Sequence, residues 1–280
     1  MPSGLAHKRL LLAKAKAAAN SPFSGLWRAK RHGSGLTFSD IRPYVAGDDV
    51  RRIDWRTSAK RGTAHVKLYE EERQATVWLA LAHAGSLGFG SRGVTKMETL
   101  LDAMALVASS AVSAGDRVGF VGGGQALPAQ RGEPWAARLL EAAESAPVRK
   151  DAVEEAGKTL LSLRARNGLI VLFTDSPDLM PDDLGTWAAL RARNAVMVVR
   201  ITDPFEENLD VPGAFRLPDG TLLDATDKKF AARYRADRAK RTAAFEKKVA
   251  SLAARHATLD GTEPAFVTLG RALEGPWAGK

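Results

Sequence analysis

The chain has 280 residues, with 41 Lys and Arg against 32 Asp and Glu and no cysteine. The lack of cysteine excludes disulfide scaffolds, thiolate metal sites and cysteine nucleophiles, and it suits a reducing cytoplasm. An apolar share of 45% and a charged share of 26% are ordinary for a globular protein. No apolar run approaches the roughly 18 residues of a membrane-spanning helix. We therefore expect a globular, cytoplasmic protein without a membrane span.

The net charge of +9 is unevenly distributed along the chain. Residues 1–35 hold seven basic residues and no acidic one, and residues 227–256 hold ten basic residues and three acidic ones. Each block therefore carries +7, and the rest of the chain carries −5. We interpret both blocks as solvated surface, with a nucleic acid, an anionic lipid or an acidic protein face as alternative contacts.

The first predicted element is a short basic helix. Residues 5–19 are mostly strong helix formers, and Asn20-Ser21-Pro22 ends the pattern. We therefore treat residues 1–35 as a basic helix and linker, an N-terminal extension of a main domain at 36–280.

From residue 64 onward, short strands alternate with helices. Residues 64–70 alternate in polarity, which places His65 and Val66 on opposite faces of a half-exposed strand. The apolar run at 75–82 is typical of a strand buried on both faces. Further strands are predicted at 117–121, 169–173 and 195–201, and helices at 96–114, 133–145, 153–164 and 182–193. A hairpin, a basic helix, and a short strand with a terminal helix follow at 215–223, 227–256 and 256–277. This order predicts the α/β class, with a doubly wound, mostly parallel sheet of the Rossmann type.

Two loops lie where such sheets bind ligands, at the carboxyl ends of strands. One runs from Ala82 to Ser86, and the other is Thr174-Asp175-Ser176. Ser86, His83 and Asp175 are the residue types of a serine-hydrolase triad, although no Gly-x-Ser-x-Gly elbow is present. We therefore keep a serine hydrolase as an alternative function.

A segment of 25 positions carries a family resemblance. It reads Gly35-x-x-Phe38-x-Asp40-x-Arg42-x-Tyr44-x-x-Gly47-Asp48-Asp49-x-Arg51-x-Ile53-Asp54-Trp55-x-x-Ser58-Ala59. This segment is similar to the signature of the bacterial "domain of unknown function 58" proteins. The buried strand, polar loop, long helix, Gly-Asp-Arg-Val-Gly-Phe strand and later Thr-Asp pair resemble a von Willebrand factor A-type domain. The resemblance implies an association with MoxR-type AAA+ ATPases, beside which such proteins are often encoded.

The resemblance also implies where a metal would bind. A-type domains commonly hold Mg²⁺ through Asp-x-Ser-x-Ser after the first strand, a Thr from another loop and an Asp after the fourth strand. Here Ala82 and Ala84 stand at the first two positions, while Ser86 and Asp175 match. Because a methyl group donates no electron pair to a hard cation, we expect a vestigial metal-ion-dependent adhesion site without metal or another cofactor.

The segment from Arg42 to Trp55 interleaves arginines and aspartates among aromatic residues. One interpretation is structural, with bidentate Arg–carboxylate pairs that lock the segment against the sheet. The other is a docking face, since Arg and Trp are enriched where proteins bind one another. The candidate partner-binding residues share an exposed or loop position: Arg42, Arg51, Arg52, Trp55, His83, Ser86 and Asp175.

Together these patterns predict a non-enzymatic protein-interaction module. We expect an adaptor or co-chaperone that contacts a MoxR-type AAA+ ATPase, its client protein, or both. The alternatives are a basic protein that binds nucleic acid through the two +7 blocks, and a serine hydrolase.

Overall fold

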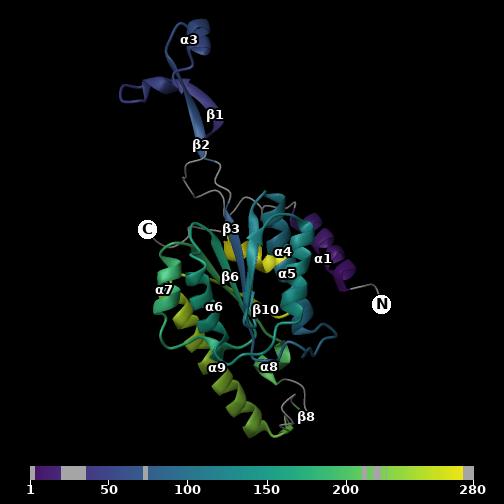
Figure 1. Cartoon of the computed structure of the whole chain (residues 1–280). Coiled ribbons are helices and arrows are strands. Elements are labelled where there is room, and N and C mark those ends of the chain that lie inside the picture. The colour runs from purple at the N-terminus through teal and green to yellow at the C-terminus, as the bar shows by residue number, and fades with distance from the viewer. Residues whose placement is uncertain are drawn as a thin grey trace. The chain divides into compact units, whose positions relative to one another are not determined.

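The computed structural model describes residues 4–19, 36–71, 75–209, 213–216, 222–224 and 226–273. The chain divides into two units (Figure 1). The larger unit comprises Met1–Trp27 and Ala75–Lys280, and the smaller unit comprises Arg28–Gln74. The sequence suggested one boundary at residue 35, whereas contacts group the N-terminal helix with the larger unit and set residues 28–74 apart.

A six-stranded sheet forms the centre of the larger unit, with the strand order β10-β7-β6-β3-β4-β5. The strands are β3 (Thr76–Ala82), β4 (Arg117–Gly122), β5 (Gln125–Gln130), β6 (Leu169–Thr174), β7 (Ala195–Ile201) and β10 (Arg255–Leu259). All neighbours are parallel except β4 and β5, which form an antiparallel pair. The predicted α/β class with a mostly parallel sheet is therefore confirmed, and the arrangement is compatible with a Rossmann-like fold.

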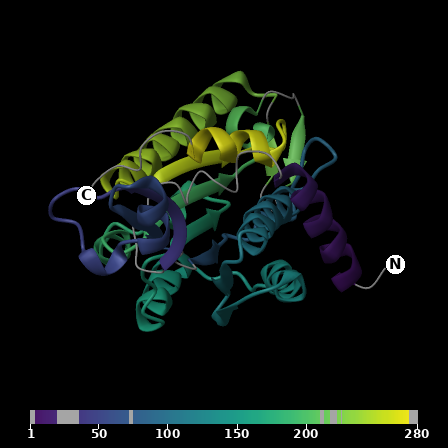
Figure 2. The same ribbon diagram turned by 90° about the horizontal axis from the view of Figure 1, so that it is seen from above.

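Helices cover both faces of this sheet (Figure 2). One face packs against α1 (Gly4–Ala19), α4 (Lys96–Ser113), α5 (Glu133–Glu144) and α10 (Ala265–Leu273). The other packs against α6 (Ala152–Ser162), α7 (Gly185–Arg191) and α9 (Lys228–Ser251). No helix among the described residues is both long enough and apolar enough to cross a membrane.

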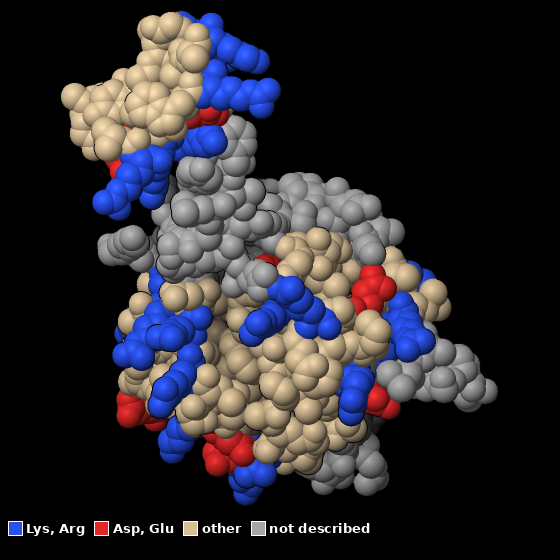
Figure 3. All heavy atoms as spheres, turned by 45° about the horizontal axis from the view of Figure 1, so that its top comes forward, with Lys and Arg blue, Asp and Glu red and all other residues tan. Residues whose placement is uncertain are grey.

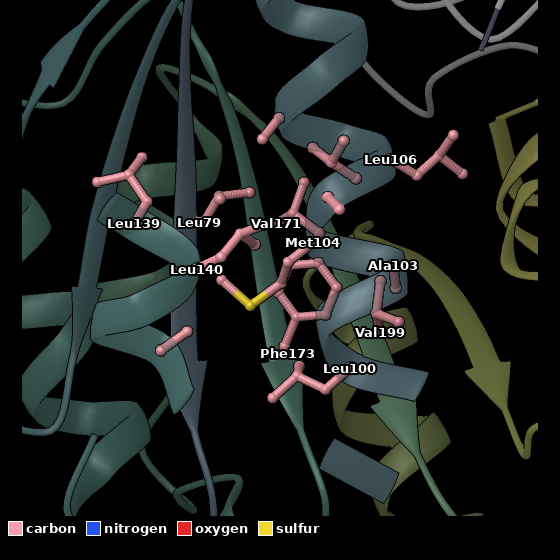
Figure 4. Close-up of a cluster of buried hydrophobic side chains, with 14 of the residues drawn as sticks. Leu79, Leu100, Ala103, Met104, Leu106, Leu139, Leu140, Val171, Phe173 and Val199 are labelled. Atoms are coloured by element: carbon pink, nitrogen blue, oxygen red, sulfur yellow. The ribbon is translucent and has the colours of Figure 1, made fainter. Parts of the chain in front are cut away.

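Alternation of side chains along β3 explains the two cores. Leu79 belongs to the first core with Val171 and Phe173 of β6, whereas Trp78 and Ala80 belong to the second. Figure 4 shows Leu79, Val171 and Phe173 beside side chains of α4 and α5. Because each strand is covered on both sides, its sequence is an apolar run rather than an alternation.

The larger unit also contains four short elements among the described residues. They are η2 (Pro177–Leu179), α8 (Pro204–Asn208), β8 (Ala214–Arg216) and β9 (Leu222–Asp224). Strands β8 and β9 form the predicted hairpin, whose turn around Pro218-Asp219-Gly220 lies outside the described residues. The sequence did not predict β5, because this edge strand is mostly exposed and lacks an apolar pattern.

The smaller unit is a β-hairpin with a helical insertion. Strands β1 (Leu36–Pro43) and β2 (His65–Glu71) are antiparallel, and η1 (Val50–Arg52) and α3 (Trp55–Arg61) lie between them in the chain. The side chain of Asp54 caps α3 by accepting hydrogen bonds from two backbone amides.

The predicted alternation along β2 is wrong where its side chains are described. His65 and Val66 are both buried. The backbone amide of His65 donates to the Ser58 hydroxyl, and its ring nitrogen Nδ1 contacts the carbonyl oxygen of Thr63. These local partners cover His65 on the side that the sequence pattern assigned to solvent.

Helix α1 packs on the larger unit through a buried leucine and a buried lysine. Leu12 is 3% exposed, and its carbonyl oxygen accepts a hydrogen bond from Ser109 of α4. The ammonium of Lys8 is buried and pairs with Glu144 of α5 at 2.8 Å. The interpretation of the N-terminal block as solvated surface is therefore wrong for Lys8.

Two neighbouring leucines test this packing. We expect Leu12→Ala to lower the free energy of unfolding by about 2–5 kcal/mol, because it leaves a cavity beneath α1. Leu10 is 53% exposed, so Leu10→Ala should change it by less than about 0.5 kcal/mol. Equal effects in urea denaturation would contradict the packing of α1.

Candidate functional site

The candidate site lies at the carboxyl ends of β3 and β6. The chain passes from β3 to β4 on one side of the sheet and later returns to place β6 on the other side of β3. Adjacent β3 and β6 therefore flank the point where the strand order reverses, which is the usual ligand position in open α/β sheets. The structure brings Ser86 and Asp175 together there, as the sequence predicted.

Asp175 holds the loop that follows β3. Its carboxylate accepts hydrogen bonds from the backbone amides of Ala84 at 2.6 Å and Ser86 at 2.9 Å, and from the Ser86 hydroxyl at 2.7 Å. Asp175 is only 2% exposed. A buried carboxylate requires such partners, so this contact fixes the β3–α4 loop against the end of β6.

Lys96 completes the site, and the sequence analysis missed it. Its Nζ donates to the Ser86 hydroxyl at 2.6 Å and the Asp175 carbonyl oxygen at 3.3 Å. It also donates to both carboxylate oxygens of Glu206 in α8, at 3.0 and 2.8 Å. The sequence did contain a signal for this role. A lysine in the first turn of a helix is unfavourable next to the positive end of the helix dipole, so its presence there indicates a stabilising partner elsewhere in the fold.

Two adjacent glutamates extend the network toward α9. Arg238 of α9 lies 3.7 Å from Glu206 and 3.1 Å from Glu207, and Arg200 pairs with Glu207 at 2.9 Å. Burial raises the pKa of Glu206, and the attraction of Lys96 and Arg238 only partly offsets this effect. Burial acts on Glu207 in the same direction, but the Thr202 hydroxyl and the neighbouring guanidinium groups outweigh it and lower its pKa.

The geometry does not assemble the Ser86–His83–Asp175 triad. The Nε2 atom of His83 contacts the carbonyl oxygen of Ala146 at 3.0 Å, and Ser86 bonds directly to Asp175. The Ser86 hydroxyl is thus held between an ammonium donor and a carboxylate acceptor, with no imidazole to take its proton.

The described residues also offer little to a metal ion. Ala82, at the end of β3, is fully buried, and Ala84 contributes its backbone amide to Asp175. Within the part of the chain that the structure describes, no group of three His, Cys, Asp or Glu side chains could hold a metal ion.

The remaining sequence candidates lie in the smaller unit, where Arg42 has a structural role. Its guanidinium donates to both carboxylate oxygens of Asp48, at 2.7 and 2.6 Å. This hydrogen-bonded pair lowers the pKa of Asp48. The expected bidentate Arg–carboxylate pair is therefore present, and it closes the turn between β1 and η1.

Arg51, Arg52 and Trp55 have a different environment. Trp55 is 72% exposed, and Val50, five residues before it in the chain, is also exposed. Among the described acidic side chains, Asp49 and Asp54 accept from the backbone amides of this segment, and none pairs with the guanidinium groups of Arg51, Arg52 or Arg56. Basic side chains project from the smaller unit (Figure 3). We call Val50, Arg51, Arg52, Trp55 and Arg56 the Trp55 patch.

Comparison with known proteins gives the family. The family model described as "Protein of unknown function DUF58" matches residues 40–251. The chain belongs to this family. An uncharacterized protein of Mycobacterium bovis and one of Mycobacterium tuberculosis are each 28% identical over 197 residues, which cover 67% of this chain and 61% of theirs. The chain thus spans about three fifths of the length of these curated relatives. No solved structure matches it.

Two aspartates that lie three residues apart in the chain, one buried and one exposed, test the importance of Asp175 for stability. We expect Asp175→Ala to lower the free energy of unfolding by about 2–4 kcal/mol, because it removes the buried carboxylate on which three hydrogen-bond donors of the β3–α4 loop converge. Asp178, whose side chain is 54% exposed and pairs with Arg241, is the matched control. Asp178→Ala should cost less than about 1 kcal/mol in the same denaturation experiment. A small effect at both positions would contradict a bracing role for Asp175.

Proposed function

We propose that this DUF58 protein is a non-enzymatic interaction module that binds an acidic protein surface through the Trp55 patch. The observation that carries the proposal is the 72% exposure of Trp55 among arginines without acidic partners in the described chain. Large exposed apolar side chains with arginines are the composition of binding hot spots, where tryptophan and arginine are the most enriched residues.

The charge arrangement of the smaller unit supports an acidic partner. Asp48 is engaged by Arg42, while Asp49 and Asp54 cap helical turns through backbone amides. The described aspartates of the segment thus contact its own backbone, Arg42 and Lys67, and the cations of the patch remain available to another molecule. Complementary charge across an interface speeds association and selects the partner.

The switch-point site supports the non-enzymatic part of the proposal. The hydroxyl of Ser86 already accepts from Lys96 and donates to Asp175, and the ring of His83 is turned to a backbone carbonyl. A serine nucleophile needs a base that takes its proton, and the acceptor here is a carboxylate, a weak base that two backbone amides already hold, while the His83 ring faces Ala146.

The family resemblance is the support for a MoxR-type ATPase as the proposed partner. Proteins with this signature are often encoded beside MoxR-type AAA+ ATPases, and the mostly parallel sheet of the larger unit is compatible with the A-type domain that the resemblance implies. We infer that the protein acts as an adaptor or co-chaperone. The ATPase would supply the energy, and this chain would present a surface to the ATPase or its client.

The nucleic-acid alternative has less support from the basic helix α9. Several of its charges are already used within the larger unit: Arg238 contacts Glu207, Arg241 contacts Asp178, and Lys248 contacts Asp182. Pairing of these side chains reduces the charge that the helix can offer to phosphates.

Binding to a purified MoxR-type ATPase from the same organism, with ATP present, tests the proposal. We expect Trp55→Ala to weaken binding by about 30-fold or more, as for a hot-spot residue. Arg51→Glu with Arg52→Glu should also weaken it and reduce its salt dependence. Arg131→Glu with Lys150→Glu, at exposed positions of the larger unit, is the charge-matched control and should bind like the wild type.

Two results would contradict the proposal. One is unchanged affinity of the Trp55→Ala protein for the ATPase. The other is binding of random duplex DNA near physiological salt that is as tight as binding of the ATPase, which would favour the nucleic-acid alternative.

A further inference from the structure

We propose that the ammonium of Lys96 is the resident cation of the switch-point site, standing where the fold resemblance would place a divalent metal ion. This inference concerns the larger unit and is independent of the partner proposed for the Trp55 patch. The residues around Lys96 suit an ammonium ion and do not suit a divalent metal ion.

The surroundings of Lys96 match an ammonium ion. Four oxygen atoms lie within 3.3 Å of Nζ: the Ser86 hydroxyl, the Asp175 carbonyl and both carboxylate oxygens of Glu206. Lys96 is 2% exposed. An ammonium has three N–H donors and no acceptor, so a set made only of oxygen acceptors satisfies it.

The same surroundings do not fit a metal ion while Lys96 is present. Oxygen ligands approach Mg²⁺ to about 2.1 Å and Ca²⁺ to about 2.3–2.6 Å, and a bound ion needs about six or more of them. Three N–H and O–H donors already occupy the carboxylate of Asp175. The methyl groups of Ala82 and Ala84 supply no further ligand.

The charges at the site are a second reason why a metal ion does not fit beside Lys96. Asp175 and Glu206 bring two negative charges to the site, while Lys96 and, 3.7 Å from Glu206, Arg238 bring two positive ones. Glu207 is in turn paired with Arg238 and Arg200, so side chains of the protein already compensate most of the negative charge around Lys96. A divalent cation would meet the Lys96 ammonium at short range in a buried, poorly screened environment, and binding would require that side chain to leave.

Lys96 holds the surrounding segments together, as a bound metal ion would. Lys96 begins α4, Ser86 lies in the β3–α4 loop, Asp175 follows β6, and Glu206 belongs to α8. One covalently attached charge thus connects four segments around the carboxyl ends of the strands. The loop is held in place independently of the metal concentration, so a partner that contacts it should bind equally well in EDTA.

Removal of the lysine should convert the site into a metal site. In Lys96→Ala, both Glu206 carboxylate oxygens, the Ser86 hydroxyl and the Asp175 carbonyl remain as four oxygen ligands, water can fill the other positions, and the positive charge of Lys96 no longer offsets the carboxylates. We expect Mn²⁺ at about one hundred times its dissociation constant to raise the Tm of this variant by about 5–10 °C. The Tm of the wild type should not change with Mn²⁺ or EDTA.

The control variant is Lys158→Ala, which removes an exposed lysine paired with Glu154 on the surface of α6. Its Tm should not respond to Mn²⁺. A folded Lys96→Ala protein that likewise fails to respond would overturn the proposal. So would a wild-type protein whose Tm rises with Mn²⁺.

A second measurement applies if Lys96→Ala does not fold without metal. Folding that Mn²⁺ restores and NaCl of equal ionic strength does not restore would support the proposal. If neither restores it, the electron paramagnetic resonance signal of free Mn²⁺ is recorded with and without the wild type. An unchanged signal supports a site filled by Lys96, and a loss of signal that is equimolar with protein contradicts it.

Discussion

The burial of the Asp175 carboxylate is the constraint on which the candidate site depends. A charge at 2% exposure is tolerated only if donors replace the water that it has lost, and here the donors come from the β3–α4 loop. Satisfying Asp175 therefore also determines the path of that loop and the position of Ser86. The Ser86 hydroxyl then directs a lone pair toward Lys96, and Lys96 in turn requires Glu206. One desolvated carboxylate thereby organises four segments of the larger unit.

The two units handle charge in opposite ways. In the larger unit, buried charges such as Lys8, Lys96 and Arg200 each have a carboxylate partner, so their fields are largely cancelled inside the protein. In the smaller unit, the described carboxylates of Asp48, Asp49 and Asp54 contact backbone amides, Arg42 and Lys67, while Trp55 and its neighbouring arginines remain exposed. This contrast is the reason why we propose partner binding for the smaller unit and a bracing role for the switch-point site.

Much of the larger unit could be predicted from sequence because its signals are local. The apolar runs of β3 and β6 indicated strands buried on both faces, and the rule for parallel sheets then placed Ser86 near Asp175. The role of Lys96 could not be predicted in this way, since Glu206 is 110 residues away and lies in a five-residue helix. His83 was also ambiguous, because only the fold shows that its ring meets the Ala146 carbonyl.

The central claim is that a lysine, and not a metal ion, supplies the positive charge between Ser86, Asp175 and Glu206. The most direct measurement is a crystal structure of the wild type grown in millimolar Mn²⁺, with anomalous difference maps recorded at the manganese edge. We predict continuous density for Lys96 with its Nζ at hydrogen-bonding distance from Ser86 and Glu206, and no anomalous peak among these residues. An anomalous peak bonded to Ser86 and Asp175, with Lys96 displaced toward solvent, would contradict the account.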